Sequence, residues 1–90
     1  MAGRIVSREE FDIAVDAVWS EIEYQNSLAI RTDEDEALTP PGFFTLLNVY
    51  LRKGEVAWTD NAGTEPCLPF LRKLAGIAIR GMIYCGIRYR

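Results

Sequence analysis

Acidic side chains are the first residues in this 90-residue sequence that could do chemistry, because the chain contains no histidine. That lack excludes histidine metal sites and catalytic pairs of cysteine or serine with histidine. Carboxylates on facing helices could instead bind Mg²⁺ for phosphohydrolase chemistry. Glu21 is the leading candidate, since it lies beside the apolar stripe of a predicted helix, and Glu55 and Asp60 are further candidate metal ligands. No acidic residue follows Glu65, so one chain cannot place four carboxylates on facing helices.

Basic and aromatic side chains suggest a second chemistry, in which a phosphate is neutralised and a base is stacked without any bond being cut. The candidate ligand-binding residues are Tyr24, Arg52, Lys53, Trp58, Arg72, Lys73 and Arg80, with Tyr50 as a further aromatic residue. Lys73 and Arg80 share a helix face, whereas Arg72 is turned by roughly 80° from Arg80, so Lys73 and Arg80 form the expected clamp. Alternatives stay open: core packing for Trp58, pairing with first-helix acids for Arg52 and Lys53, and a solvated basic face for all the cations.

The charges are divided unevenly along the chain. The net charge is −3, yet residues 1–45 hold 3 basic and 10 acidic residues, whereas residues 46–90 hold 7 basic and 3 acidic ones. The overall acidic excess argues against sequence-independent binding of DNA or RNA, so no nucleic-acid partner is expected. The division has two interpretations: an acidic helix packs beside basic ones, or the basic half meets an anionic ligand.

Three helices must position these side chains, at about residues 7–27, 41–58 and 65–85. Ser7 and Glu10 predict a capping box at the start of the first helix, ahead of an apolar stripe. The first and second helices are joined by an acid-rich connection that is too charged to be buried, and the second is expected to stop in the turn-forming run 59–63.

The third helix carries its own start and stop signals. Pro66 suits a first helical position and Gly86 a C-cap. Small residues along this helix (Ala75, Gly76, Ala78 and Gly81) indicate that another helix or a ligand approaches closely. Cys67 and Cys85 would lie roughly 27 Å apart on one helix, so they cannot bridge each other and are expected to be small buried hydrophobes.

The elements together predict an all-α fold in a single domain, residues 1–90. A chain this short buries only a small fraction of its surface on folding, which limits the stability of a monomer, so we expect a homo-oligomer. No stretch approaches the ~20 apolar residues that span a bilayer, and the first residues do not form a signal peptide. The expected location is therefore cytoplasmic, with no membrane partner.

Several runs of the sequence resemble small MazG-like proteins of phages and bacteria. The run 21–25 resembles the "E-R-x-Y-Q" end of their first helix, and the runs 41–44 and 50–58 resemble their second helix with its terminal "A-W". The run 71–78 resembles their "L-R-K-x-A-A-x-A" third helix, and Cys85-Gly86 their "H-G" ending. The similarity covers about residues 14–86.

The resemblance implies an all-α bundle that assembles from two or more protomers and is related to nucleoside triphosphate pyrophosphohydrolases. Those enzymes bind Mg²⁺ through paired acids on two helices and cut between the α and β phosphates. Here Glu21 keeps its place, but Phe43 stands where small relatives often carry Glu, and Gly76 and Arg80 stand where acids would be needed.

The expected function is therefore binding of a nucleotide or nucleotide-derived signalling molecule at an oligomer interface, without efficient hydrolysis and with no required cofactor, as in sequestration or regulation. One alternative is a Mg²⁺-dependent pyrophosphohydrolase with Glu21 and Glu55 as catalytic residues from neighbouring protomers and Asp60 as a further ligand. Another is an acidic module that binds a protein partner through Asp12, Asp16, Glu23 and residues 33–36.

Overall fold

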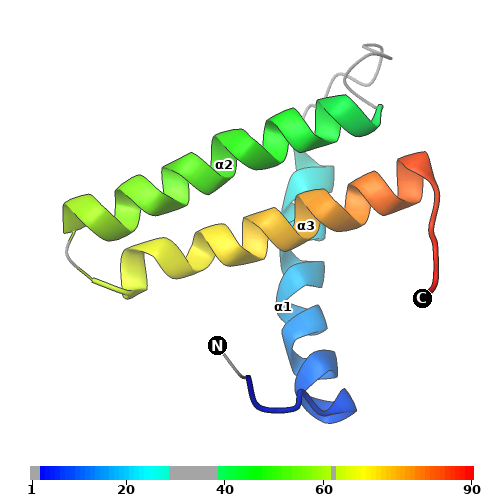
Figure 1. Cartoon of the computed structure of the whole chain (residues 1–90), viewed down its shortest axis with the longest axis horizontal. Coiled ribbons are helices and arrows are strands. Elements are labelled where there is room, and N and C mark those ends of the chain that lie inside the picture. The colour runs from blue at the N-terminus through cyan, green and yellow to red at the C-terminus, as the bar shows by residue number, and fades with distance from the viewer. Residues whose placement is uncertain (1–2, 29–38, 62) are drawn as a thin grey trace.

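The computed structural model describes residues 3–28, 39–61 and 63–90, and within them the chain is all-helical without strands (Figure 1). The helices are α1 (Arg8–Ser27), α2 (Pro40–Asn61) and α3 (Leu68–Cys85), and a 3-10 turn, η2 (Glu65–Cys67), leads into α3. The all-α prediction is confirmed. The predicted acidic connection, residues 31–36, lies outside the described residues.

The start of α1 and the end of α3 agree with the capping residues predicted from the sequence. The Ser7 hydroxyl accepts a hydrogen bond from the Glu10 N–H at 3.0 Å, and the Glu10 carboxylate accepts one from the Ser7 N–H at 3.1 Å. Hydrogen bonds from the Arg4 side chain and then from Ser7 hold the pKa of Glu10 below its ordinary value. Gly86 caps α3 at a φ of 131° and donates its N–H to the Met82 carbonyl.

The end of α2 differs from the prediction. The helix continues through the turn-forming residues to Asn61, beyond the expected end at residue 58. The Thr59 hydroxyl donates a hydrogen bond to the Glu55 carbonyl at 2.9 Å, so this polar side chain bonds back into the helix.

The second and third helices form an antiparallel pair joined by η2 (Figure 1). Phe43 is buried in this pair, and its ring stacks on that of Tyr84 with centroids 6.0 Å apart. A β-carbon at Gly81 would lie 3.3 Å from the Phe43 ring, so the absence of a side chain at position 81 allows the ring to pack closely against α3.

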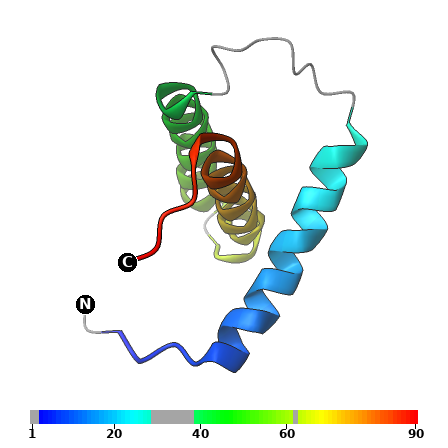
Figure 2. The same cartoon turned by 90° about the vertical axis from the view of Figure 1, so that its right-hand side faces the viewer.

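The first helix packs on α3 and, within the described part of the chain, not on α2. Figure 2 shows α1 inclined away from the α2–α3 pair on one side of it. The contact centres on Gly76, where an added β-carbon would lie 3.1 Å from Cγ of Glu21. The close approach predicted from the small residues is therefore confirmed at two of them: Gly76 faces α1, and Gly81 faces α2.

The hydrophobic core of the chain is small. Among the described residues only two apolar side chains are buried, Phe43 and Ile77, while many large apolar side chains on all three α-helices are exposed. The expectation of buried cysteines is wrong: Cys67 is half-buried, and Cys85 is exposed in the last turn of α3. As for membranes, none of the helices in the described ranges is both long and apolar enough to cross one.

Candidate functional site

A polar cluster lies where α1 crosses α3, and Glu21 is at its centre. The Glu21 side chain is 3% exposed. Arg72 Nε donates a hydrogen bond to Oε1 of Glu21 at 2.9 Å, and Gln25 Nε2 donates one to Oε2 at 3.1 Å. Lys73 Nζ lies 3.6 Å from the same Oε2. The buried carboxylate therefore has partners on both oxygens, two of them cationic.

These partners decide the protonation of Glu21. Burial by itself raises the pKa of its carboxyl group, but the hydrogen bonds from Arg72 and Gln25 and the charges of Lys73 and Arg72 outweigh that effect. The pKa of Glu21 therefore lies below its ordinary value of 4.5, and the side chain is an anion at neutral pH.

Gln25 connects this cluster to Arg80. Its amide oxygen accepts a hydrogen bond from Arg80 Nε at 2.6 Å, while its amide nitrogen donates to Glu21. A terminal nitrogen of Arg80 also donates to the Asn26 side-chain oxygen. Both partners of Arg80 are neutral amides, so these bonds orient the guanidinium without cancelling its charge.

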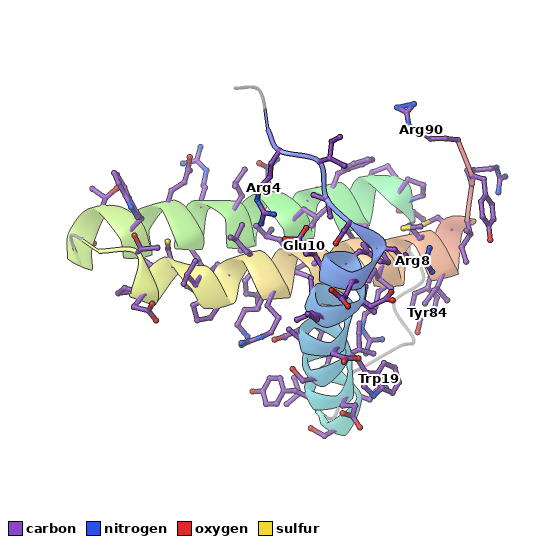
Figure 3. All side chains as sticks on the ribbon, turned by 90° about the horizontal axis from the view of Figure 1, so that it is seen from below. Arg4, Arg8, Glu10, Trp19, Tyr84 and Arg90 are labelled. Atoms are coloured by element: carbon purple, nitrogen blue, oxygen red, sulfur yellow. The ribbon has the colours of Figure 1, made fainter. Side chains whose placement is uncertain are left out.

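A groove of about 440 Å³ opens beside Arg80, between α1 and α3. Its walls are mostly apolar, and two aromatic side chains, Trp19 of α1 and Tyr84 of α3, contribute to them. Figure 3 shows these two on the same side of α1. The full lining is Val15, Val18, Trp19, Ile22, Asn26, Ile79, Arg80, Ile83 and Tyr84. The site thus combines an apolar, partly aromatic cavity with one oriented cation.

Five of the sequence-predicted site residues lie at the α1–α3 crossing: Glu21, Tyr24, Arg72, Lys73 and Arg80. Arg72 and Lys73 bind Glu21, and Lys73 Nζ also lies 5.5 Å from the centroid of the Tyr24 ring. These pairs agree with the interpretation that an acidic helix packs beside a basic one, because an acid of α1 pairs with cations of α3. Lys73 and Arg80 both face α1, as their spacing predicts, but they contact different side chains there.

The predicted site residues of α2 lie elsewhere. Arg52, Lys53, Glu55, Trp58 and Asp60 are exposed on that helix, and none takes part in the contacts of Glu21 or Arg80 given above. Lys53 Nζ lies 4.9 Å from the centroid of the Tyr50 ring in its own helix. Trp58 is not part of the core of this chain.

The three candidate metal ligands do not converge within one chain. Among the residues that the structure describes, no group of three or more Cys, Asp or Glu side chains is placed to hold a metal ion. A Mg²⁺ ion at Glu21 would also have to displace Arg72 and Lys73 from its oxygens. A site shared by Glu21 and Glu55 of neighbouring protomers stays a prediction.

Of the polar and aromatic residues that line the groove, sequence reasoning identified Arg80 and missed Trp19, Asn26 and Tyr84. Trp19 had a usable signal, since it lies four residues after Val15 and three before Ile22 and so belongs to the apolar stripe of α1. Asn26 and Tyr84 had none, because their role depends on where α1 crosses α3.

No protein-family model, curated protein or solved structure matches this chain. The MazG-like resemblance therefore stays a prediction, and the functional argument depends on the geometry of the site.

Proposed function

We propose that this protein binds a nucleotide or nucleotide-derived anion in the groove between α1 and α3 and does not hydrolyse it efficiently. The observation that carries the proposal is Arg80, whose guanidinium borders an aromatic-walled groove and is held by neutral amides alone in the contacts described. An oriented cation next to an apolar cavity suits a ligand with an anionic end and a flat apolar end.

Each part of a nucleotide has a matching feature. Arg80 can donate charge-assisted hydrogen bonds to a phosphate, because guanidinium geometry suits two phosphate oxygens at once. The rings of Trp19 and Tyr84 can stack on a base, and stacking contributes about 1 to 3 kcal/mol for each base. A volume of about 440 Å³ lies within the range of roughly 300 to 1,000 Å³ that is usual for small-molecule sites.

Binding without turnover is favoured by the state of the acids. Pyrophosphohydrolysis with Mg²⁺ needs several carboxylates around the metal. Glu21 is already paired with Arg72 and Lys73, and Glu55 and Asp60 are exposed on α2. A protein of this kind would sequester a nucleotide signal or respond to it.

Replacing Arg80 by glutamine should weaken nucleotide binding by at least about tenfold, because a hydrogen bond to a charged group contributes about 1.5 to 3 kcal/mol. Trp19→Ala should also weaken binding through the loss of stacking. Calorimetric titration with nucleoside mono- and triphosphates and cyclic dinucleotides, with and without Mg²⁺, measures the affinity. Chromatography of the recovered ligand then tests for cleavage.

The matched control is Arg88→Gln, which removes an exposed arginine from the C-terminal tail and should leave the affinity unchanged. Circular dichroism confirms that each variant is folded. Two results would contradict the proposal: no nucleotide in the panel binds, or Arg80→Gln binds as well as the parent chain. Recovery of monophosphate and pyrophosphate only with Mg²⁺ would favour the hydrolase instead.

A further inference from the structure

We infer that a second copy of this chain packs on the outer face of the α2–α3 pair, with α2 of the two copies antiparallel and crossing at Leu51. The outer face is defined by six apolar residues: Phe44, Leu51 and Trp58 of α2, and Leu71, Ala78 and Met82 of α3. It lies on the opposite side of the pair from α1, so the inference does not depend on a ligand in the groove.

Helical spacing places these residues on one side of the pair. Phe43 of α2 faces Gly81 and Tyr84 of α3. Helical spacing from Phe43 and Gly81 sets Tyr50 and Ala57, both half-buried, and the buried Ile77 on the inner sides of their helices. Every residue of the outer face directly follows a residue on the inner side of its helix. Leu71, for example, follows Phe70, whose side chain lies next to Gly54 of α2. Each residue along an α-helix is turned by 100° from the one before it. Because α2 and α3 are antiparallel, the residues that follow the inner residues lie on the same side of the pair in both helices.

This side of the pair has no covering helix in the described residues. Figure 2 shows α1 on the other side of α2 and α3. Ala78 is exposed, and the five larger side chains of the outer face are between 45% and 68% exposed. A row of large apolar side chains on two adjacent helices marks an interaction surface, since isolated soluble domains rarely expose such a patch.

The accessible surface of the chain exceeds the area expected for a folded monomer of its mass. It measures 7505 Å², whereas a folded monomer of 10.2 kDa is expected to expose about 5,300 Å². A standard interface removes about 800 Å² from each partner. The area that one such interface would bury is smaller than the difference between the observed and the expected accessible surface. That difference also includes surface outside the outer face.

The spacing of the α2 residues identifies the partner as a second copy. A two-fold interface must be self-complementary, because the same patch contributes from both sides. Leu51 lies midway between Phe44 and Trp58, seven residues from each. In an antiparallel pair crossing at Leu51, each copy's Phe44 would face the other copy's Trp58, and the two Leu51 side chains would meet at the axis.

The charged residues of α2 are compatible with this register. Glu55 lies one turn from Leu51, and antiparallel pairing about Leu51 sets it level with Leu47 of the other copy, while Arg52 is level with Tyr50. No charge is therefore placed opposite a like charge, which would oppose association.

The decisive variant is Leu51→Glu, which brings two carboxylates together at the axis and should weaken dimerisation by at least about a hundredfold, since like-charge contacts cost several kcal/mol. Sedimentation equilibrium over a wide range of concentration should give twice the chain mass for the parent protein and the single chain mass for the variant. A mixture of Leu51→Glu with Leu51→Lys should recover the dimer, because opposite charges then meet.

The matched control is Val49→Glu. Val49 directly precedes the inner residue Tyr50, whereas Leu51 directly follows it, so the two lie on opposite sides of α2. Val49 is 44% exposed and Leu51 48%, so both changes add a carboxylate to a similar surface, yet Val49→Glu should stay dimeric. Circular dichroism should show unchanged helix content for both. A parent chain that is monomeric at every concentration would overturn the inference, as would a dimer that Leu51→Glu leaves intact or a mixture that does not reassociate. The proposal of a ligand in the groove is tested independently, because Arg80→Gln should still sediment with the mass of a dimer.

Discussion

Phe43→Ala is expected to lower the free energy of unfolding by about 3 to 5 kcal/mol. Phe43 is one of two buried apolar side chains in the described residues, and its ring contacts Gly81 and Tyr84 between α2 and α3. Truncating a buried phenylalanine removes its transfer free energy and leaves a cavity. A chain of this length has a stability of roughly 5 to 13 kcal/mol, so the variant should lose a large part of it. Urea denaturation followed by circular dichroism measures the loss.

Phe11→Ala is the control for this experiment. Phe11 is exposed on α1, and its ring faces the Arg8 guanidinium, 5.5 Å from the centroid. Its removal should cost less than about 1 kcal/mol, because an exposed cation–π contact contributes about 0.5 to 1 kcal/mol. Equal losses for the two variants would show that Phe43 is not central to the packing of α2 on α3.

Glu21→Gln is expected to cost about 1 to 2 kcal/mol at pH 7, and this cost should shrink as the pH falls. The glutamine keeps the shape of the side chain but removes the charge that Arg72 and Lys73 contact. The loss is at the low end for charged hydrogen bonds, because both cations keep part of their surface in water.

The direction of the pH effect follows from the pKa of Glu21. That pKa lies below its ordinary value of 4.5 in the folded chain, so near this pH the unfolded state binds more protons than the folded state. The stabilisation from Glu21 is complete above the unfolded pKa and is lost as the pH falls through the folded pKa. The difference in unfolding free energy between the parent chain and Glu21→Gln should therefore narrow below about pH 4.5.

Glu23→Gln provides the comparison, since Glu23 is exposed two residues further along the same helix. Its replacement should change the unfolding free energy by less than about 0.5 kcal/mol, as is usual for exposed positions. A gap between the parent chain and Glu21→Gln that stays constant from pH 7 to pH 3 would contradict the assigned role of the Glu21 carboxylate.

The ligand groove and the outer face lie on opposite sides of α3. A dimer formed through the outer face would leave both α1–α3 grooves open to solvent, one on each copy. The sequence-level prediction of a ligand at an oligomer interface therefore differs from the arrangement proposed here, and the Arg80 and Leu51 variants distinguish the two sites.

The three helices could be predicted from the amino-acid sequence, because the signals for each lie within one or two turns of chain. Ser7 with Glu10 and the glycine at position 86 mark ends that the structure confirms. The end of α2 was missed because the composition of residues 59–63 favours a turn, whereas the Thr59 hydroxyl bonds back to Glu55. The position of Glu21 beside an apolar stripe likewise identified it as the leading candidate among the acidic residues for a functional site.

The contacts of the site residues follow from how the helices pack and could not be predicted from the sequence. Arg72 is 51 positions from Glu21 in the chain, and Arg80 is 55 from Gln25, so no local pattern encodes these pairs. They depend on α1 crossing α3 at Gly76, where the missing side chain lets Glu21 and Gln25 approach. Helix periodicity specifies which residues share a face, but the angle and depth at which two helices pack follow from the shapes of both surfaces together.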